Sequence, residues 1–358
     1  MSFVKTFVNF LADPRLFFLM AVAALGVLIW KRRVVATTRF GYGLMGLLTL
    51  FFLFGAADPN FRLIIMKPDN VPIVGLVFLL VFFTWYALRH GVLNDERRAQ
   101  GKPPLEKDEE DRVWVWPDLV YTELISLILC SVVLIIWSIF LKAPLEQPAN
   151  RSLTPNPSKA PWYFLGLQEM LVYFDPWLAG VVLPGLIIVG LMAIPYIDTN
   201  PKGNGYFTFS ERKAEITIFL FGFAVLWSSL IVLGTFLRGP NWNFFGPFEY
   251  WDIHKLVPLT NVNLSEYIWL RAFQSGLPKN WFVREIFGIV LTLAYVFVLP
   301  GLLARTWLKV YYEKMGPPRY YVGAFLFLMM LSLPVKMLLR WIFNLKYIVA
   351  IHEFFFNI

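Results

Sequence analysis

The chain has 358 residues, of which 58% are hydrophobic and 18% aromatic, and its mean hydropathy is +0.60. These values exclude an ordinary soluble domain and indicate a membrane protein with several spans. The net charge of +8 does not require a nucleic-acid partner, because Lys and Arg gather at the cytoplasmic ends of membrane spans. The single cysteine, Cys130, excludes an internal disulfide and any cysteine-ligated iron–sulfur centre within the chain.

Eight apolar runs approach or exceed the roughly 20 helical residues that cross a bilayer. The first run is followed by Lys31, Arg32 and Arg33, whereas a signal peptide carries its basic residues in front, so we expect a retained span. The predicted fold class is an all-α polytopic membrane protein with about eight transmembrane helices and one interfacial amphipathic helix. The predicted spans are residues 16–30, 42–56, 71–87, 119–141, 177–197, 214–236, 282–303 and 320–339.

Three polar segments separate groups of spans. Residues 91–117 contain the charged run Lys107–Arg112, which is typical of a solvated, partly disordered connector. Residues 142–161 include Pro144 and Pro148 and predict an extended loop, and residues 237–281 are rich in Trp, Phe and Pro, as at an interfacial aromatic belt. We therefore expect a three-span N-terminal extension (1–90), a cytoplasmic connector (91–117), a central domain (118–236), and a C-terminal region with the aromatic loop and two spans (237–358).

The distribution of basic residues predicts the orientation. The loops after the first, third, fifth and seventh spans hold most of the interhelical Lys and Arg, and the positive-inside rule places them in the cytoplasm. Both termini and residues 142–176 are then expected on the periplasmic side of an inner (cytoplasmic) membrane.

The titratable residues favour few kinds of chemistry. The histidines, His90, His254 and His352, lie near span ends or in loops, so we expect this chain alone to ligate no haem, and we expect no metal site. Glu123 lies about one turn inside the fourth span. Its position is consistent with helix capping or with a direct proton role.

Residues 161–198 (PWYFLGLQEMLVYFDPWLAGVVLPGLIIVGLMAIPYID) combine an aromatic amphipathic piece, Trp162–Phe174, with a span. At about 3.6 residues per turn, Trp162, Glu169 and Tyr173 share one helix face. Such a helix lies in the membrane interface, either as an anchor alone or as the roof of a cavity. An aromatic slot with one carboxylate would suit a quinol, because its ring stacks on aromatic side chains and the carboxylate accepts a hydroxyl proton.

The order of a Pro-rich loop, Pro161-Trp162-Tyr163-Phe164, an amphipathic helix and a span ending in Ile194-Pro195-Tyr196-Ile197-Asp198 resembles the C-terminal half of cytochrome b. In split complexes of the plastoquinol–plastocyanin reductase type, that half is a separate protein, subunit IV. The resemblance covers about residues 113–236, so it implies that 118–236 is a cytochrome b C-terminal-like domain. In that family the corresponding loop lies on the positive side, where quinol is oxidised.

One position departs from the family pattern. The family usually reads Pro-Glu/Asp-Trp-Tyr, whereas Pro161 precedes Trp162 here and cannot transfer a proton. Glu169, seven residues after Trp162 and on the same helix face, is the nearest candidate to replace the missing carboxylate. The resemblance implies a quinol-binding site at Trp162, Tyr163, Phe164 and Tyr173. That Glu169 is the catalytic acid–base group is our inference from its place on the helix, and not a property of the family.

The resemblance implies a subunit of a respiratory or photosynthetic quinol–electron-acceptor oxidoreductase of the quinol–cytochrome c reductase type, inactive by itself. The substrate would be menaquinol or ubiquinol. The b-type haems would lie on a partner resembling the N-terminal half of cytochrome b, and a Rieske protein or a c-type cytochrome would take the electrons.

Two alternatives stay open. A structural subunit would keep the cytochrome b shape without a working quinol site, as the missing acid suggests. A transporter would show mid-span polar residues or inverted repeats, and the sequence has few central charges and no convincing repeat.

Overall fold

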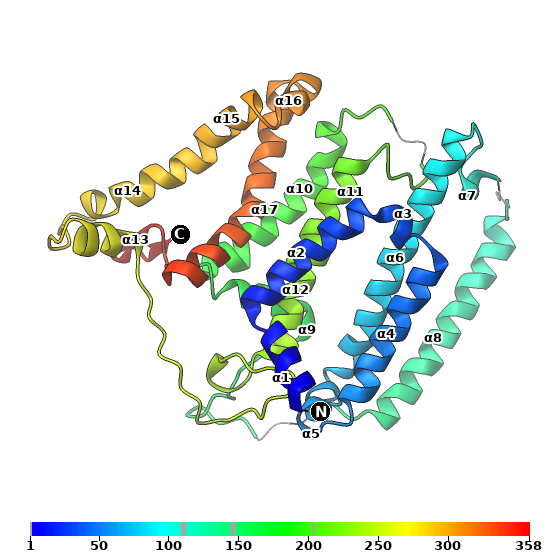
Figure 1. Cartoon of the computed structure of the whole chain (residues 1–358), viewed down its shortest axis with the longest axis horizontal. Helices are drawn as coiled ribbons and strands as arrows, with labels where there is room; N and C mark the ends of the chain where they lie inside the picture. Colours follow the sequence, from blue (N-terminus) through cyan, green and yellow to red (C-terminus); the bar gives the residue numbers. More distant parts are fainter. Residues whose placement is uncertain (1, 109–111, 144, 146–147, 203–204) are drawn as a thin grey trace. The chain divides into compact units, whose positions relative to one another are not determined.

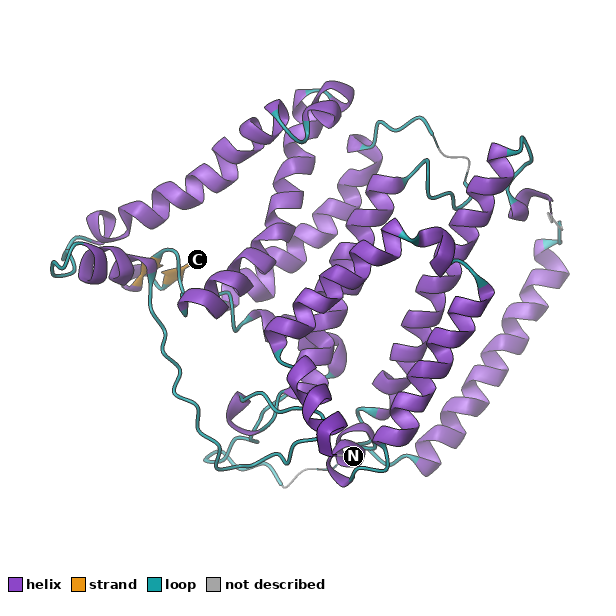
Figure 2. Cartoon of the chain, viewed as in Figure 1, coloured by secondary structure: helices purple, strands orange, loops and turns teal. Residues whose placement is uncertain are grey.

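The computed structural model describes residues 2–108, 112–143, 145, 148–202 and 205–358 (Figure 1). The acidic residues 109–111 of the predicted connector and Pro144 of the predicted extended loop lie outside these residues. The described chain consists of helices and loops with two short strands (Figure 2), which confirms the predicted all-α membrane fold.

Seven helices within the described residues are long and apolar enough to cross a membrane, and they correspond to the second to eighth predicted spans. Several of them join α-helical and π-helical (η) segments. They are α4 (Thr38–Gly55), α6 (Val71–Ala99), η1 with α8 (Val115–Phe140), η2 with α10 (Leu178–Ile197), α11 to η4 (Lys213–Leu237), α14 to α15 (Trp281–Arg305) and α17 (Pro317–Phe343).

The first predicted span is a bent pair of helices. It corresponds to α2 (Pro14–Trp30), which alone is shorter than the other spans. Together with α1 (Ser2–Leu11) it is long enough to cross a membrane, but the axes of the two helices are bent by 76°. The break lies at Asp13-Pro14, where the Asp13 carboxylate accepts a hydrogen bond from the Arg15 backbone N–H and caps a new helix. Proline favours this first-turn position because it has no N–H to leave unpaired.

The spans divide into segments with the following bounds: η1 (Val115–Leu119), α8 (Val120–Phe140), η2 (Leu178–Val182), α10 (Leu183–Ile197), α11 (Lys213–Leu220), η3 (Phe221–Trp227), α12 (Ser228–Val232), η4 (Leu233–Leu237), α14 (Trp281–Leu293), η7 (Ala294–Val298) and α15 (Leu299–Arg305). The shorter elements are α3 (Arg32–Val35), α5 (Pro59–Ile65), α7 (Leu105–Asp108), α9 (Trp162–Met170), η5 (Pro240–Trp242), α13 (Leu264–Glu266), η6 (Tyr267–Ala272), α16 (Lys309–Met315), β1 (Ala350–Ile351), η8 (His352–Phe354) and β2 (Phe356–Asn357).

The chain forms two compact units that are each built from separate stretches of sequence. The first comprises Met1–Trp162, Lys202–Val225 and Thr235–His254, and the second comprises Tyr163–Pro201, Leu226–Gly234 and Lys255–Ile358.

In the first unit, α6 continues past the predicted end of its span at Ala87 to Ala99. Asn94, which is fully buried, accounts for this extension. Its amide donates hydrogen bonds to the Phe207 carbonyl oxygen (2.9 Å) and to Glu106 Oε2 (2.8 Å). The predicted solvated connector is therefore wrong for residues 91–99, because a buried amide anchors neighbouring loops to a helix there.

His90 belongs to the same cluster. Its Nδ1 lies 3.0 Å from Glu106 Oε1. Burial acts to raise the pKa of Glu106, but hydrogen bonds from its own backbone N–H, Asn94 and His90 outweigh burial and hold that pKa below its usual value. The residue is thus kept as a carboxylate that ties α6 to α7.

In the second unit, α15 and α17 share a small core of Ala304, Tyr320 and Ala324. The Tyr320 hydroxyl donates a hydrogen bond to the Pro300 carbonyl oxygen at 2.9 Å. This contact joins α15 to α17, which leads into the C-terminal segment (residues 344–358).

A glycine contact in the first unit makes a testable prediction. A Cβ added at Gly41 of α4 would overlap the buried indole of Trp85 on α6, whereas a Cβ at Gly43 would meet nothing within 4 Å. We expect Gly41→Ala to destabilise the protein by about 1–3 kcal/mol through overpacking. Gly43→Ala should leave stability unchanged or raise it slightly, because alanine favours a helix. Thermal unfolding in detergent measures both, and equal midpoints for the two variants would contradict the α4–α6 contact.

Candidate functional site

The predicted amphipathic piece forms a short helix, α9, which ends at Met170 rather than at Phe174. The next three backbone N–H groups bond to carbonyls three residues earlier, so the chain tightens into turns and leaves Tyr173 beyond the helix. One face of α9 is buried. It comprises Leu165, Gly166, Glu169 and Met170.

The structure separates the predicted site residues into two groups. Trp162, Tyr163 and Phe164 expose 36%, 52% and 53% of their surfaces, and the rings of Tyr163 and Phe164 lie 4.9 Å apart. Tyr173 and Glu169 are buried, and Tyr173 meets the Trp341 ring edge-on at 6.3 Å. Pro161 precedes the helix and is exposed.

Glu169 has no exposed surface, because α9 packs closely on the second unit's part of the Lys213–Leu237 span. A Cβ at Gly234 would lie 2.8 Å from Leu165 Cγ and 3.0 Å from Glu169 Cγ. The missing side chain at Gly234 therefore makes the space that these two side chains occupy. Burial of a carboxylate in this way has a free-energy cost that its polar contacts must offset.

The turn after α9 is held by the C-terminal segment, residues 344–358. Lys346 Nζ donates hydrogen bonds to the carbonyl oxygens of Leu171 (3.3 Å) and Val172 (3.2 Å). Burial and the nearby Arg340 charge lower the pKa of Lys346, and Asp175 partly opposes them. These bonds satisfy carbonyls that the end of α9 leaves unpaired.

Asp175 is a second anchor for the same turn. Its Oδ2 accepts hydrogen bonds from Asn357 Nδ2 (2.9 Å) and the Tyr347 hydroxyl (3.3 Å). Burial raises the pKa of Tyr347, and the charge and hydrogen bond of Asp175 add to the rise. Tyr347 therefore stays a neutral donor to this carboxylate.

Lys336 of α17 lies behind this network and is 3% exposed. Its Nζ donates a hydrogen bond to the Lys346 carbonyl oxygen at 2.8 Å and lies 5.7 Å from the centre of the Phe174 ring. The contact suits a cation over an aromatic face. A buried amine thus supports the turn that follows α9.

The C-terminal segment is itself fixed to α14. Glu285, which is 1% exposed, accepts a hydrogen bond from the Ala350 backbone N–H at 3.0 Å, and Arg284 pairs with Glu353 at 2.8 Å. Hydrogen bonding from Arg284 lowers the pKa of Glu353, which keeps that group ionised. At Gly288 a Cβ would overlap the Ile348 carbonyl oxygen.

The histidines do not assemble a ligand set. Among the described residues, no group of three His, Cys, Asp or Glu side chains could hold a metal ion. His90 pairs with Glu106 in the first unit, as described above.

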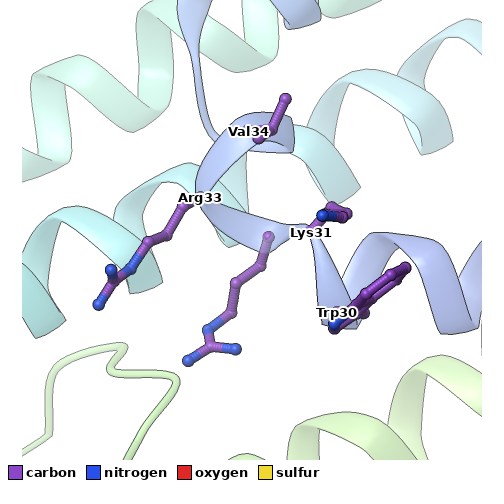
Figure 3. A pocket seen from close by; sticks show the side chains of 5 residues that line it. Trp30, Lys31, Arg33 and Val34 are labelled. Carbon is purple, nitrogen blue, oxygen red and sulfur yellow. The ribbon is translucent and has the colours of Figure 1, made fainter.

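A second candidate site is a cavity of about 330 Å³ lined by residues 30–34, at the end of α2 in the first unit. Its basic side chains diverge: Figure 3 shows Arg33 on the left of the turn and Lys31 on the right. The cavity therefore lacks the convergent polar groups of a small-molecule site.

Sequence reasoning missed the residues that support α9 from the C-terminal part. Lys336 and Glu285 both lie in spans. Because a charged residue within a span is rare and often functional, the sequence alone could have indicated both. Asp175, Lys346 and Tyr347 gave no such signal, because hydrogen bonds between distant segments leave no periodicity in the sequence.

The Gly288 contact predicts how the C-terminal segment can be released. Gly288→Ala would push the Ile348 carbonyl from α14 and break the Glu285–Ala350 bond, with an expected loss of about 1–3 kcal/mol. Limited proteolysis should then cut residues 344–358 faster than in the unsubstituted protein. In the matched control Gly301→Ala, where the nearest atom lies 3.9 Å away, cleavage should not change. Equal cleavage of both variants would contradict the contact between α14 and the C-terminal segment.

Residues 148–246 match the family model described as cytochrome b(C-terminal)/b6/petD. The match includes α9, α10 and the Lys213–Leu237 span, and it begins after α8, which the resemblance inferred from sequence had included. No solved structure matches the chain. The matched residues include both α9 and Gly234, which lies against it. This membrane protein therefore carries a cytochrome b C-terminal-like segment, which supports the resemblance inferred from the sequence.

Proposed function

We propose that the chain is a membrane subunit of a quinol–electron-acceptor oxidoreductase and that α9 forms part of its quinol oxidation site. The match of residues 148–246 to the cytochrome b C-terminal family carries this proposal. Its family context is that of a bc- or b6f-type complex, with a partner that resembles the N-terminal half of cytochrome b. That partner would hold the b-type haems, and a Rieske protein or c-type cytochrome would accept the electrons.

Within this proposal, Glu169 takes the role of the acid that Pro161 replaces. It is a carboxylate on α9 that is shielded from bulk solvent. Oxidation of a quinol releases two protons and two electrons, and a carboxylate within hydrogen-bond reach of a hydroxyl accepts one of those protons.

The exposed rings of Trp162, Tyr163 and Phe164 would form the open side of the site. Exposed aromatic side chains at a membrane surface stack on a flat quinol ring, and a partner subunit would complete the pocket. Tyr173, buried against Trp341, would fix the turn below. The substrate would be menaquinol or ubiquinol.

The orientation proposed for the chain rests on its basic loops, which favour the cytoplasm. Both termini and α9 then lie on the periplasmic side of the inner membrane. The three N-terminal spans within residues 1–90 and the region after residue 246 would be additions that meet other subunits.

A structural subunit without a quinol site is the second candidate. The proline at position 161 and the close packing of Glu169 on Gly234 favour it, because neither leaves an obvious proton acceptor open to substrate.

Replacement of the Glu169 carboxylate distinguishes the two candidates. In the intact complex, Glu169→Gln should slow quinol oxidation by about 100-fold or more, because the amide cannot accept the proton. Haem content and subunit ratio should stay unchanged. The control Glu313→Gln changes an exposed acid of α16 and should leave the rate unchanged. Full turnover of Glu169→Gln would remove this residue from the mechanism.

The exposed aromatic ring at position 163 gives an independent test. Tyr163→Ala should raise the KM for quinol by roughly 2- to 10-fold through the lost stacking, with assembly intact. Tyr311→Ala, at an exposed tyrosine of α16, serves as the control. An unchanged KM for Tyr163→Ala would favour the structural subunit.

A further inference from the structure

The helix α1 is amphipathic in an inverted sense. At about 100° per residue, Phe3, Phe7 and Phe10 fall within roughly 60° of one another, and Lys5 and Asn9 lie about 150° away. The three phenylalanines expose 81%, 50% and 62% of their surfaces, whereas Lys5 and Asn9 are half-buried. A surface helix of a water-soluble protein turns its apolar side toward the core. In α1 the polar side faces the protein instead.

The exposed side, which we call the aromatic face, consists of Phe3, Val4, Phe7 and Phe10. The rings of Phe3 and Phe7 stack with their centres 6.4 Å apart. Thr6 lies just outside the face, which itself contains no polar side chain. Whatever covers the aromatic face therefore needs to supply no hydrogen bond, and acyl chains meet that condition.

Lys5 fastens the polar side of α1 to α5. Its Nζ pairs with Asp58, a buried carboxylate that caps the start of α5. Burial acts to raise the pKa of Asp58, but hydrogen bonds from Lys5 and from the backbone N–H groups of Phe61 and Asn60 outweigh burial and lower that pKa. Asp58 thus stays ionised and holds Lys5.

Asn9 fastens the same side of α1 to a loop that follows the Lys213–Leu237 span. Its Oδ1 accepts a hydrogen bond from the Phe248 backbone N–H at 2.9 Å. Gly246 permits this approach, because a Cβ there would lie 2.4 Å from Asn9 Cγ and 2.6 Å from Asn9 Cβ. Asn60 of α5 donates to the Phe248 carbonyl oxygen at 3.3 Å. The helices α1 and α5 therefore hold one loop, at the end of the segment that matches the cytochrome b family.

The contacts of α1 place it at a membrane surface. The short helix α5 connects the spans α4 and α6, and the loop at Phe248 follows the Lys213–Leu237 span. Four of the described spans, an even number, separate these two connections, so both lie on the same side of the membrane. Figure 1 shows the N-terminus beside α5, at one end of α4 and α6. The helix α1 thus lies where spans end.

The direction of α1 follows from its bend. Its axis departs from that of α2 by 76°. A straight span through both helices would carry Asp13 and Arg15 into the hydrocarbon, where charged side chains are costly. With the bend, Arg15 and Lys31 bracket the apolar part of α2, and α1 runs along the membrane surface.

The neighbouring helix α5 has the composition of an interfacial helix. Its Phe61, Ile64 and Ile65 are buried, whereas Leu63 and Met66 are exposed beside the basic residues Arg62 and Lys67. Exposed apolar side chains next to basic ones are typical of helices that lie at a lipid surface. The surroundings of α1 therefore favour lipid as the cover of its aromatic face.

We propose that α1 lies flat in the membrane interface, with its aromatic face inserted among the acyl chains of the adjacent leaflet. Its polar side would tie the loop at Gly246 and Phe248 to that surface. Under the proposed orientation this is the periplasmic leaflet. The proposal goes beyond the quinol chemistry and does not depend on it.

Spin-label accessibility in the intact complex, reconstituted into bilayers, tests the proposal. Cys130→Ser removes the single cysteine, and Phe7→Cys then carries one nitroxide. The label should collide with oxygen more than with the water-soluble reagent NiEDDA, at a depth of about 5–10 Å within the headgroup and acyl boundary. Leu47→Cys, exposed in the middle of α4, is the lipid reference, and Gln100→Cys, exposed after α6, is the water reference.

The other outcomes of this measurement overturn the proposal. Preferential collision with NiEDDA would place the aromatic face in water. Shielding from both reagents would place it against another subunit. A lipid-inserted label in a complex that Glu169→Gln leaves fully active would keep this inference and reject the proposed function of Glu169.

Substitution of Gly246 tests the attachment of the polar side. Gly246→Ala would displace Asn9, so the label at position 7 should become more mobile and more accessible to NiEDDA. Gly26→Ala in α2, where an added Cβ meets nothing within 4 Å, is the control and should change neither property. Equal mobility of the label in both variants would contradict the attachment through Asn9.

Discussion

The close approach of α9 to Gly234 is the contact on which the candidate site depends. Because position 234 has no side chain, Leu165 and Glu169 reach the backbone of the neighbouring span and Glu169 loses all contact with solvent. Trp162, Tyr163 and Phe164 stay exposed in the first turn of this nine-residue helix, before the residues that meet Gly234. The helix thus carries exposed aromatic rings at its start and a buried carboxylate near its end.

The C-terminal segment holds α9 in place against Gly234. A nine-residue helix has little stability of its own. Its end is secured by hydrogen bonds from Lys346 to the carbonyls of Leu171 and Val172 and by the Asn357 and Tyr347 bonds to Asp175. Glu285 and Gly288 of α14 hold the segment in turn. The last residues of the chain therefore connect α14 with the turn that follows α9.

Hydrophobic runs were sufficient to predict the spans, because a bilayer demands about 20 apolar residues wherever a helix crosses it. The polar contacts escaped prediction for a physical reason: Asn94 prolongs α6, and Lys346 braces α9, through partners more than a hundred residues away. The amphipathic period placed Glu169 on one face with Trp162 and Tyr173, but it carried the helix too far, since tight turns after Met170 replace α-helical bonds. The predicted roles of the site residues rest on the family resemblance and remain a proposal.

Photolabelling of the intact complex with an azido-quinone tests the central claim most directly. The account predicts label on residues 162–174, displaced by excess quinol and lost when the exposed rings of Tyr163 and Phe164 are removed. Label confined to other subunits, with residues 162–174 unmodified at full occupancy, would contradict a quinol site at α9.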